Sequence, residues 1–282
     1  MKQSKKIAII GGSGVYKMEG IELIAEHDIS TPYGKPSAPV KEFKIEDYFF
    51  YFIPRHGENH IFTPTEVNYC ANIYSLKMLG VDTIISVSAV GSLNEKCPPT
   101  SFVFPDQFID RTKGKRASTF FHEGLVGHVS CADPIEKSLK DRLYQIAQEN
   151  NIPSMNNGTY LCIEGPQFST KAESHLYRSW GATIIGMTNV PESYLAKEAG
   201  MAYATIAMVT DFDCWKEEHC SVEEIMKVAK QNNINVQKII KQAIPNLIKN
   251  PIEFTPENNN AVMTSPEIIS YDDSLVLNLL LK

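Results

Sequence analysis

The sequence lacks paired cysteine motifs, long apolar runs and an excess of basic residues. Its six cysteines are scattered and never spaced Cys-x-x-Cys, which argues against a zinc site or a disulfide framework in a chain of 282 residues. No stretch approaches the roughly 18 consecutive apolar residues of a membrane-spanning helix. The apolar run behind the basic N-terminus, residues 7–10, is too short for a signal-peptide core. We therefore expect a cytoplasmic protein with no membrane partner.

The charge balance is acidic, with 27 Lys and Arg against 33 Asp and Glu, a formal net charge of −6. A dedicated nucleic-acid binder needs a basic surface to neutralise phosphates, so we expect no nucleic-acid partner. Hydrophobic residues at 43% and charged residues at 21% are typical of a globular protein. Because there is no internal repeat or long linker, we expect a single domain over residues 1–282, with a loop-like stretch at 249–262 and a C-terminal tail at 263–282.

Short apolar runs alternate with glycine or proline breaks and capped helices along the chain. This rhythm predicts an α/β fold with a central twisted, mixed sheet and helices on both faces. Strands are expected at 7–10, 48–53, 83–87, 102–104, 160–163, 182–185 and 201–209. Helices are expected over 63–80, from 133, from 170, over 191–199, and from 221 to the neighbourhood of Pro245.

Polar residues and glycines gather where five of these strands end, the edge at which α/β sheets bind ligands. The five segments are 11–14 (Gly-Gly-Ser-Gly), 55–56 (Arg-His), 86–91, 187–192 and 210–215. Each segment alone also fits an ordinary turn, a solvated loop or close packing. Together they predict one pocket in which an anion is held by Ser13, Arg55, His56, Ser88 and Thr188, while Asp211 and Asp213 recognise a polar heterocycle. Phe168 is expected to lie on the flat ring.

Rival interpretations of these segments are weaker. Residue 17 is lysine where a dinucleotide-binding turn needs its third glycine, and the Gly-Lys-Ser/Thr ending of a P-loop is missing. A metal at Asp211 and Asp213 lacks further ligands at suitable spacing. No serine lies in a Gly-x-Ser-x-Gly elbow, so no hydrolase triad is indicated.

The order of several motifs resembles the trimeric nucleoside phosphorylases, and within them the methylthioadenosine phosphorylases. The matching stretches are 9–14, 31–37, 55–57, 67–73, 106–112, 163–166, 195–200 and 210–216, so the resemblance covers roughly residues 6–248 in order. It departs at Ser13 and Ser88, where threonine is common, although both keep a hydroxyl. Residues 113–127 differ more.

The resemblance implies a partly barrel-like nucleoside phosphorylase fold and a homotrimer. It also implies phosphorolysis of S-methyl-5′-thioadenosine, with inorganic phosphate as co-substrate and no cofactor or metal. The phosphate site would comprise Ser13, Arg55, His56, Ser88, the Ala89 amide and Thr188. The nucleoside site would comprise Phe168, Ser169, Met187, Asp211, Asp213, Val222, Ile225 and Met226, with His128 from a neighbouring subunit. Asp211 would be the catalytic acid, delivering a proton to purine N7.

Two alternatives stay open from the sequence. A related phosphorylase could prefer methylthioinosine, adenosine or another purine nucleoside, although an acidic pair favours a 6-amino base over a 6-oxo base. An α/β module that binds nucleotides without turnover is the alternative from a different class.

Overall fold

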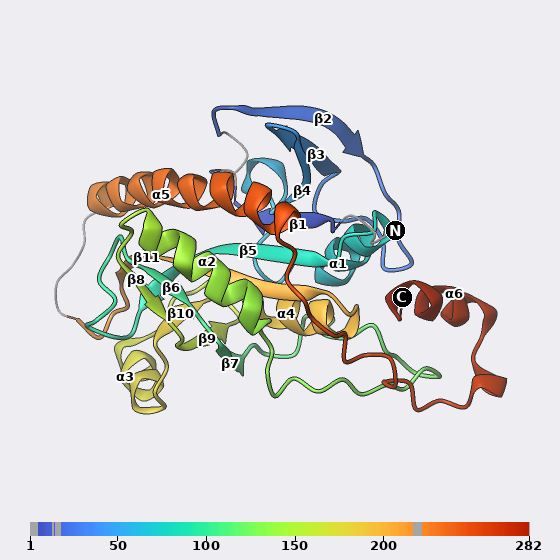
Figure 1. Ribbon diagram of the computed structural model, residues 1–282. Helices are drawn as coiled ribbons and strands as arrows, with labels where there is room; N and C mark the ends of the chain where they lie inside the picture. The colour runs from blue at the N-terminus through green and yellow to red at the C-terminus, as the bar shows by residue number, and fades with distance from the viewer. Residues whose placement is uncertain (1–4, 13, 15–17, 217–221, 282) are drawn as a thin grey trace.

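The computed structural model describes residues 5–12, 14, 18–216 and 222–281, in which strands and helices alternate (Figure 1). The strands are β1 Ile7–Gly11, β2 Ile21–His27, β3 Val40–Ile45, β4 Tyr48–Pro54, β5 Thr83–Ser92, β6 Phe102–Phe104, β7 Gln107–Arg111, β8 Ser154–Asn156, β9 Thr159–Ile163, β10 Ile184–Gly186 and β11 Ala202–Phe212. The helices are α1 Tyr69–Met78, α2 Lys137–Glu149, α3 Lys171–Ser179, α4 Asn189–Glu198, α5 Val222–Lys249 and α6 Tyr271–Leu280. Short 3₁₀ turns lie at Glu58–His60 and Pro266–Ile268.

The strands form one mixed sheet that branches at β5. The main path runs β2-β3-β4-β1-β5-β10-β9-β7, while β11 pairs with β5 and leads on to β6 and β8. Strands β4, β1, β5 and β11 are parallel, and β10 is antiparallel to β5. Helices α5 and α4 lie on opposite sides of β5 (Figure 1). The predicted mixed sheet flanked by helices is confirmed. It is open, because no pairing among the described residues closes it into a ring.

Strand register brings the predicted strand ends together. Strand β1 is buried along its whole length, as its continuous apolar run predicts for a central parallel strand. Gly11 pairs with Pro54 at the end of β4, so Arg55 follows directly beside the glycine turn. Ile10 pairs with Ser86 on the other side, so the polar half of β5 continues past the same edge.

The β5–β11 pair brings the acidic residues to this edge as well. The two strands run parallel in register from their starts to a bulge between Val209 and Asp211, after which Asp211 pairs with Gly91 and Phe212 with Ser92. The bulge takes up one extra residue, Thr210, and re-aims the strand end, as bulges beside binding sites commonly do.

Two predicted helix starts were wrong. Helix α2 begins at Lys137 rather than at residue 133, because Glu136 caps it by accepting a hydrogen bond from the Ser138 N–H at 3.1 Å. Helix α1 begins at Tyr69 rather than near residue 63, because Asn68 caps it by accepting a hydrogen bond from the Ala71 N–H at 3.0 Å. Thr63 and Glu66 close a separate turn. Helix α5 continues through Pro245 to Lys249, since buried apolar residues on both sides of the proline keep that face packed on the core. The Thr170–Glu173 capping box that starts α3 is confirmed.

The C-terminal segment contains a helix that the sequence pattern did not reveal. Helix α6 starts at the Ser270 cap and packs beside α1 (Figure 1). Asn258 fixes the chain leading to it by donating to the carbonyls of Glu198 and Leu280 at 2.8 and 2.9 Å. Strands β2, β3, β7 and β8 were also not predicted. Within the described part of the chain, no helix has both the length and the apolarity to cross a membrane.

Candidate active site

Arg55 is buried at the sheet edge and paired with a carboxylate. The side chain follows β4, is 2% exposed, and donates from Nε and Nη2 to the two Glu192 oxygens at 2.6 and 2.8 Å. Nη1 donates to the Val87 carbonyl at 3.0 Å, and its second hydrogen has no acceptor among the described residues. Burial alone would lower the pKa of Arg55, but the Glu192 carboxylate raises it above its ordinary value. The guanidinium therefore stays charged and offers one N–H to a ligand.

Glu192 is the centre of a buried hydrogen-bond network. It lies in the first turn of α4, is 1% exposed, and accepts from Ser86 Oγ at 2.8 Å and from the Tyr203 hydroxyl at 2.9 Å besides Arg55. Asn189 donates to both of these hydroxyls at 3.0 Å. A buried ion pair this well satisfied holds the guanidinium in one orientation. Sequence reasoning did not assign Glu192; the signal was a buried arginine that required a counter-charge.

His56 presents an unprotonated ring nitrogen. Its Nδ1 donates to the Phe62 carbonyl at 2.9 Å, and its ring stacks on His60 with centroids 4.4 Å apart. Burial lowers the pKa of His56 to about 4, and the positive charge of Arg55 adds to this effect. Near neutral pH the ring is therefore neutral, with Nε2 as an acceptor for the proton of a hydrogen phosphate.

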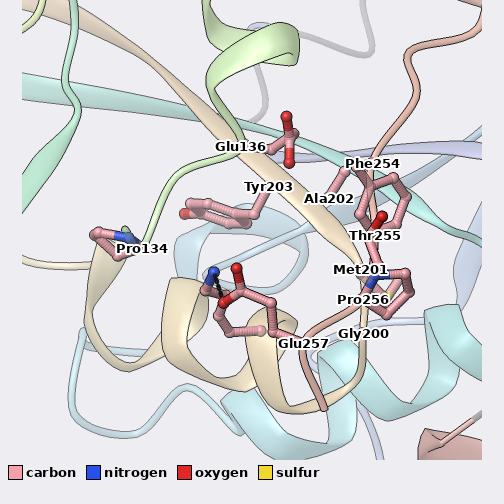
Figure 2. A pocket seen from close by; sticks show the side chains of 11 residues that line it. Pro134, Glu136, Gly200, Met201, Ala202, Tyr203, Phe254, Thr255, Pro256 and Glu257 are labelled. Atoms are coloured by element: carbon pink, nitrogen blue, oxygen red, sulfur yellow. Dashed lines mark hydrogen bonds and ion pairs between the residues drawn. The ribbon is translucent and has the colours of Figure 1, made fainter. Parts of the chain in front are cut away.

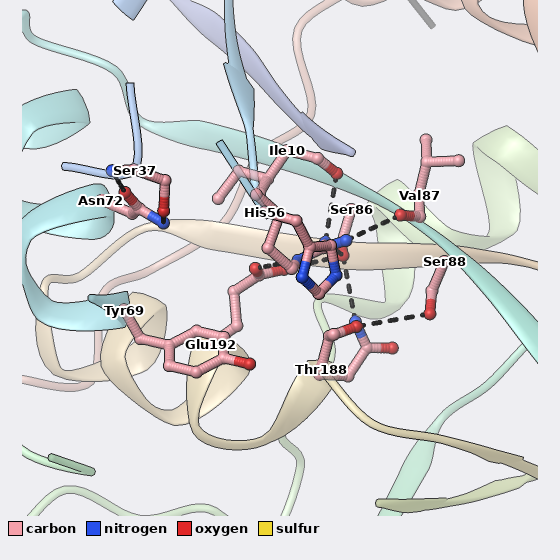
Figure 3. A network of polar contacts seen from close by, with 12 residues as sticks. Ile10, Ser37, His56, Tyr69, Asn72, Ser86, Val87, Ser88, Thr188 and Glu192 are labelled. Carbon is pink, nitrogen blue, oxygen red and sulfur yellow. Dashed lines mark hydrogen bonds and ion pairs between the residues drawn. The ribbon is translucent and has the colours of Figure 1, made fainter. Parts of the chain in front are cut away.

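Ser88 and Thr188 meet across the branch point of the sheet. Their hydroxyl oxygens lie 3.4 Å apart, and both residues are 5% exposed. Ala89, next along β5, is exposed. Of the six residues predicted to hold an anion, His56, Ser88 and Thr188 lie close together in Figure 3, and Arg55 donates to Glu192 and Ser86 beside them. Ser13 lies outside the described residues.

Asp211 and Asp213 form the acidic side of the site. Asp211 Oδ1 accepts from Thr210 Oγ1 at 2.6 Å, whereas Asp213 Oδ2 is buried without a hydrogen-bond partner among the described residues. Burial raises the pKa of both carboxyls, and the charge of Asp213 raises the pKa of Asp211 further. Gly91 lies against both residues, since a Cβ there would be 3.7 Å from Asp211 Oδ2 and 3.6 Å from Asp213 Cβ. The pair can therefore hold a proton and still accept a donor.

The loop after β9 reaches this acidic pair. Cys214 Sγ contacts the Ser169 carbonyl at 3.2 Å, and the buried Ser169 hydroxyl has no partner among the described residues. Phe168 is 84% exposed, so its ring is available to a ligand. Met226, in the first turns of α5, is 69% exposed. The side chains of Val222 and Ile225 lie outside the described residues.

Arg116 positions the Met187 segment, a role that sequence reasoning missed. The guanidinium is 7% exposed and donates from Nη1 to the Met187 and Val190 carbonyls, at 2.7 Å each. It also donates from Nη2 to the Glu164 carbonyl at 2.8 Å. One side chain thus ties the loop after β9 to the turn between β10 and α4.

The structure does not bring His128 to these residues within one chain. His128 is exposed, and its N–H donates to the Ala261 carbonyl at 2.8 Å. Gly127 pairs with Val262, so this loop joins the C-terminal segment. In Figure 1 the segment between β7 and α2 extends toward α6, away from the first turns of α5.

A separate pocket lies at the other end of β11 (Figure 2). The Lys197–Glu257 ion pair, 2.8 Å long, crosses it, and Tyr203 forms part of its wall. At ~3.3 Å per residue along a strand, Tyr203 is roughly 26 Å from Asp211. None of the predicted site residues lines this pocket. In the described ranges no cluster of three or more His, Cys, Asp or Glu side chains could hold a metal ion.

Comparison with known proteins places the chain in a family. The model of the phosphorylase superfamily matches residues 6–245, a range that includes every predicted site residue. The chain belongs to the phosphorylase superfamily.

Individual relatives share between 35% and 50% of its residues over the matched ranges. The S-methyl-5′-thioadenosine phosphorylase of Geobacter sulfurreducens is 50% identical over 84% of each chain, and that of Pyrococcus furiosus is 50% identical over 86% of this chain and 93% of its own. A crystal structure of methylthioadenosine phosphorylase from an antarctic soil metagenomic library covers both chains fully, with 45% identity and a TM-score of 0.93. A mutant of the adenosine/methylthioadenosine phosphorylase of Schistosoma mansoni, in complex with adenine, covers 87% of this chain and 91% of its own, with 35% identity and a TM-score of 0.81.

Proposed function

We propose that the chain catalyses the phosphorolysis of S-methyl-5′-thioadenosine to adenine and 5-methylthioribose 1-phosphate, in purine and methionine salvage. The observation that carries the proposal is the arrangement along β5. Ser88, beside Arg55 and Thr188, is three residues from Gly91, which pairs with Asp211. Three residues of strand span about 10 Å. A ribose fits between an anion on one side and a purine on the other.

The reaction follows from the residue types at the two ends. The bond between ribose C1′ and purine N9 breaks with its electron pair going to the purine, and a phosphate oxygen forms the new bond to C1′. Asp211, whose pKa is raised by burial, would give a proton to N7 so that adenine leaves as a neutral molecule. The proton returns to Asp211 from solvent. Phosphate is both nucleophile and counter-charge to the cationic sugar, so the protein supplies positioning and electrostatics.

Phosphate would be held by hydroxyls, amides and one guanidinium N–H. The proposed donors are Ser13, Ser88, Thr188, the Ala89 amide and the free Nη1 hydrogen of Arg55. His56 Nε2 would accept a hydrogen bond from hydrogen phosphate, since Nδ1 is already donating to the Phe62 carbonyl. Inorganic phosphate is a co-substrate, and we propose that no further cofactor or metal takes part.

Adenine would provide hydrogen-bond partners for the polar atoms that have none on the acidic side. Asp213 would accept from the exocyclic N6 amine, which suits its unpartnered Oδ2, and Ser169 offers a second buried polar atom. Phe168 would lie on the ring and Met187 against the ribose. Val222, Ile225 and Met226 would form the methylthio pocket, worth about 1–3 kcal/mol of selectivity over a hydroxyl. We propose a cytoplasmic homotrimer in which His128 reaches the site of a neighbouring subunit.

A phosphate-dependent ultraviolet assay tests the proposal. Methylthioadenosine, adenosine, methylthioinosine and inosine are compared at equal concentrations, each with and without phosphate. We expect phosphate-dependent adenine release with methylthioadenosine far ahead. Preference for a 6-oxo nucleoside would contradict the roles of Asp211 and Asp213. No turnover of any nucleoside would leave only purine binding.

Adenosine is a second candidate substrate. One solved relative carries adenosine in its name, and Met226, on the proposed 5′ side of the site, is 69% exposed. Equal rates with adenosine and methylthioadenosine would favour this broader function.

A further inference from the structure

A buried phenol lies directly behind the two hydroxyls of the anion site. Tyr160, in β9, is 0% exposed, and its hydroxyl oxygen lies 3.2 Å from Ser88 Oγ. The phenol also contacts Thr188. Nothing in the proposed chemistry requires Tyr160 to touch a substrate, and it was not among the predicted site residues.

The fold makes specific room for this hydroxyl. A Cβ at Gly186, the last residue of β10, would lie 2.0 Å from the Tyr160 oxygen. Any other residue at position 186 would therefore displace the phenol. The ring itself is fixed by edge-on packing against Phe108, with centroids 5.7 Å apart. The Tyr160 hydroxyl is thus held in one place, beside Gly186, which lies two residues before Thr188 in the chain.

The number of hydroxyl hydrogens in the cluster determines whether the phenol donates or accepts a hydrogen bond. Ser88, Thr188 and Tyr160 carry one hydroxyl hydrogen each. Burial raises the pKa of Tyr160 to about 12, so the phenol keeps its hydrogen near neutral pH. If Ser88 and Thr188 both donate to an anion, their oxygens can accept, and the phenol is the adjacent donor. In the ligand-free structure the Ser88 hydroxyl is also within 3.4 Å of the Ala89 carbonyl, an acceptor that competes with an anion for the Ser88 hydrogen.

We propose that Tyr160 is a positioning residue of the anion site: its phenol donates to Ser88 and thereby turns the Ser88 and Thr188 hydroxyl hydrogens toward bound phosphate. The inference rests on the proposed function, because it takes phosphate as the ligand. Donors oriented before the ligand arrives need no reorganisation, and a chain of hydrogen bonds polarises each donor further.

Replacement of Tyr160 by phenylalanine tests this role because it removes only the hydroxyl. In the full-length protein we expect Tyr160→Phe to raise the phosphate KM about tenfold, as the loss of one oriented buried hydrogen bond does. The nucleoside KM should stay within about twofold. Tyr33→Phe is the matched control, since the Tyr33 hydroxyl donates to the Phe120 carbonyl at the same 3.2 Å outside the proposed site. We expect it to leave both KM values unchanged.

A double-mutant cycle separates positioning from packing. If Tyr160 acts through Ser88, Tyr160→Phe should have little further effect on phosphate KM in a Ser88→Ala background. Additive effects would overturn the proposal, as would an unchanged phosphate KM in Tyr160→Phe. For variants of low activity, the rise in Tm with inorganic phosphate reports the same affinity without turnover. An equal rise in wild type and Tyr160→Phe would also overturn it. A wild type with no phosphate-dependent turnover would instead refute the proposed function, so the two failures are distinguishable.

Discussion

The two sides of the candidate site differ in how their polar atoms are satisfied. On the anion side, Glu192 accepts four hydrogen bonds from three side chains, and the Arg55 guanidinium keeps a single free hydrogen. On the base side, Asp213 Oδ2 and Ser169 Oγ are buried without partners in the described chain, and Phe168 is 84% exposed. The charged groups of the anion side are paired before a ligand arrives, although Asn189 Oδ1 there is buried without a partner among the described residues. On the base side a carboxylate oxygen itself lacks a partner.

The difference follows from what each side has to do. A phosphate carries its charge throughout the reaction, so fixed donors stabilise it best when they are already oriented. A purine becomes a good leaving group only if it receives a proton, so its acid must hold one near neutral pH. An ion pair would lower the pKa of Asp211, whereas burial beside a second carboxyl raises it. The paired charges of the anion side therefore stabilise the fold, whereas the buried carboxyls of the base side reduce the free energy of unfolding.

The largest effect should come from breaking the ion pair. Glu192→Ala leaves the Arg55 charge buried and unpaired, and we expect the free energy of unfolding to fall by about 3–5 kcal/mol. Chemical denaturation measures this loss. Phosphate-dependent activity should fall with it at temperatures where the variant is still folded.

Glu257→Ala is the control for this variant. Glu257 also pairs with a cation, Lys197, but is 55% exposed, and such pairs contribute about 0–1 kcal/mol. If both variants lose the same stability, the anion side is no more tightly assembled than the surface.

Asp211→Asn should separate activity from stability. An amide cannot deliver the N7 proton, so we expect kcat to fall at least ~10²-fold. Because burial raises the pKa of Asp211, the folded state binds its proton more tightly than the unfolded state does. The free energy of unfolding therefore decreases as pH rises through the raised pKa, and asparagine removes this loss. At neutral pH the variant should be at least as stable as wild type.

Two measurements check Asp211→Asn, the pH profile of kcat and the Tm at neutral pH. Wild-type kcat should decline on the alkaline side as Asp211 loses its proton, and the residual activity of the variant should lack that decline. A variant that is inactive and also strongly destabilised would remove the contrast between the two sides.

Phe168→Ala should have the smallest effect. A stacked base contributes about 1–3 kcal/mol, and the largely exposed Phe168 ring should give the lower end of this range. We therefore expect the nucleoside KM to rise about five- to tenfold, with phosphate KM and Tm unchanged. Ile268→Ala, at a residue that is 73% exposed in the 266–268 turn, is the matched control and should change neither KM. A change in phosphate KM for Phe168→Ala would mean that the two sides are coupled.

Buried strands could be predicted from the sequence more readily than exposed ones. Strands β1, β4, β5, β9 and β11 are buried apolar runs ending at glycine or polar residues, and all were predicted. Strand β2 was missed because most of its side chains are exposed, so it lacks a period-two pattern. The start of α1 was misplaced because two capping signals lie five residues apart, at Thr63 and Asn68. Only the contacts of Asn68 decide between them.

Residues that face the ligand could be predicted from the sequence, whereas residues that support them could not. Strand ends revealed Arg55, Ser88 and Asp211 because chemistry-bearing side chains follow apolar runs there. Glu192 and Tyr160 were not assigned, since each acts through a partner far along the chain, 137 and 72 residues away. Such pairings depend on the register of the branched sheet, which residue types alone do not determine.

Whether phosphate is the nucleophile is tested most directly by identifying the sugar product. Methylthioadenosine is incubated with the protein with and without inorganic phosphate, and the products are followed by phosphorus NMR and adenine absorbance. We predict adenine release only with phosphate, together with an equal amount of a sugar 1-phosphate. Adenine release without phosphate, giving the free sugar, would show that water attacks C1′ and would contradict the assignment of a pre-assembled phosphate side.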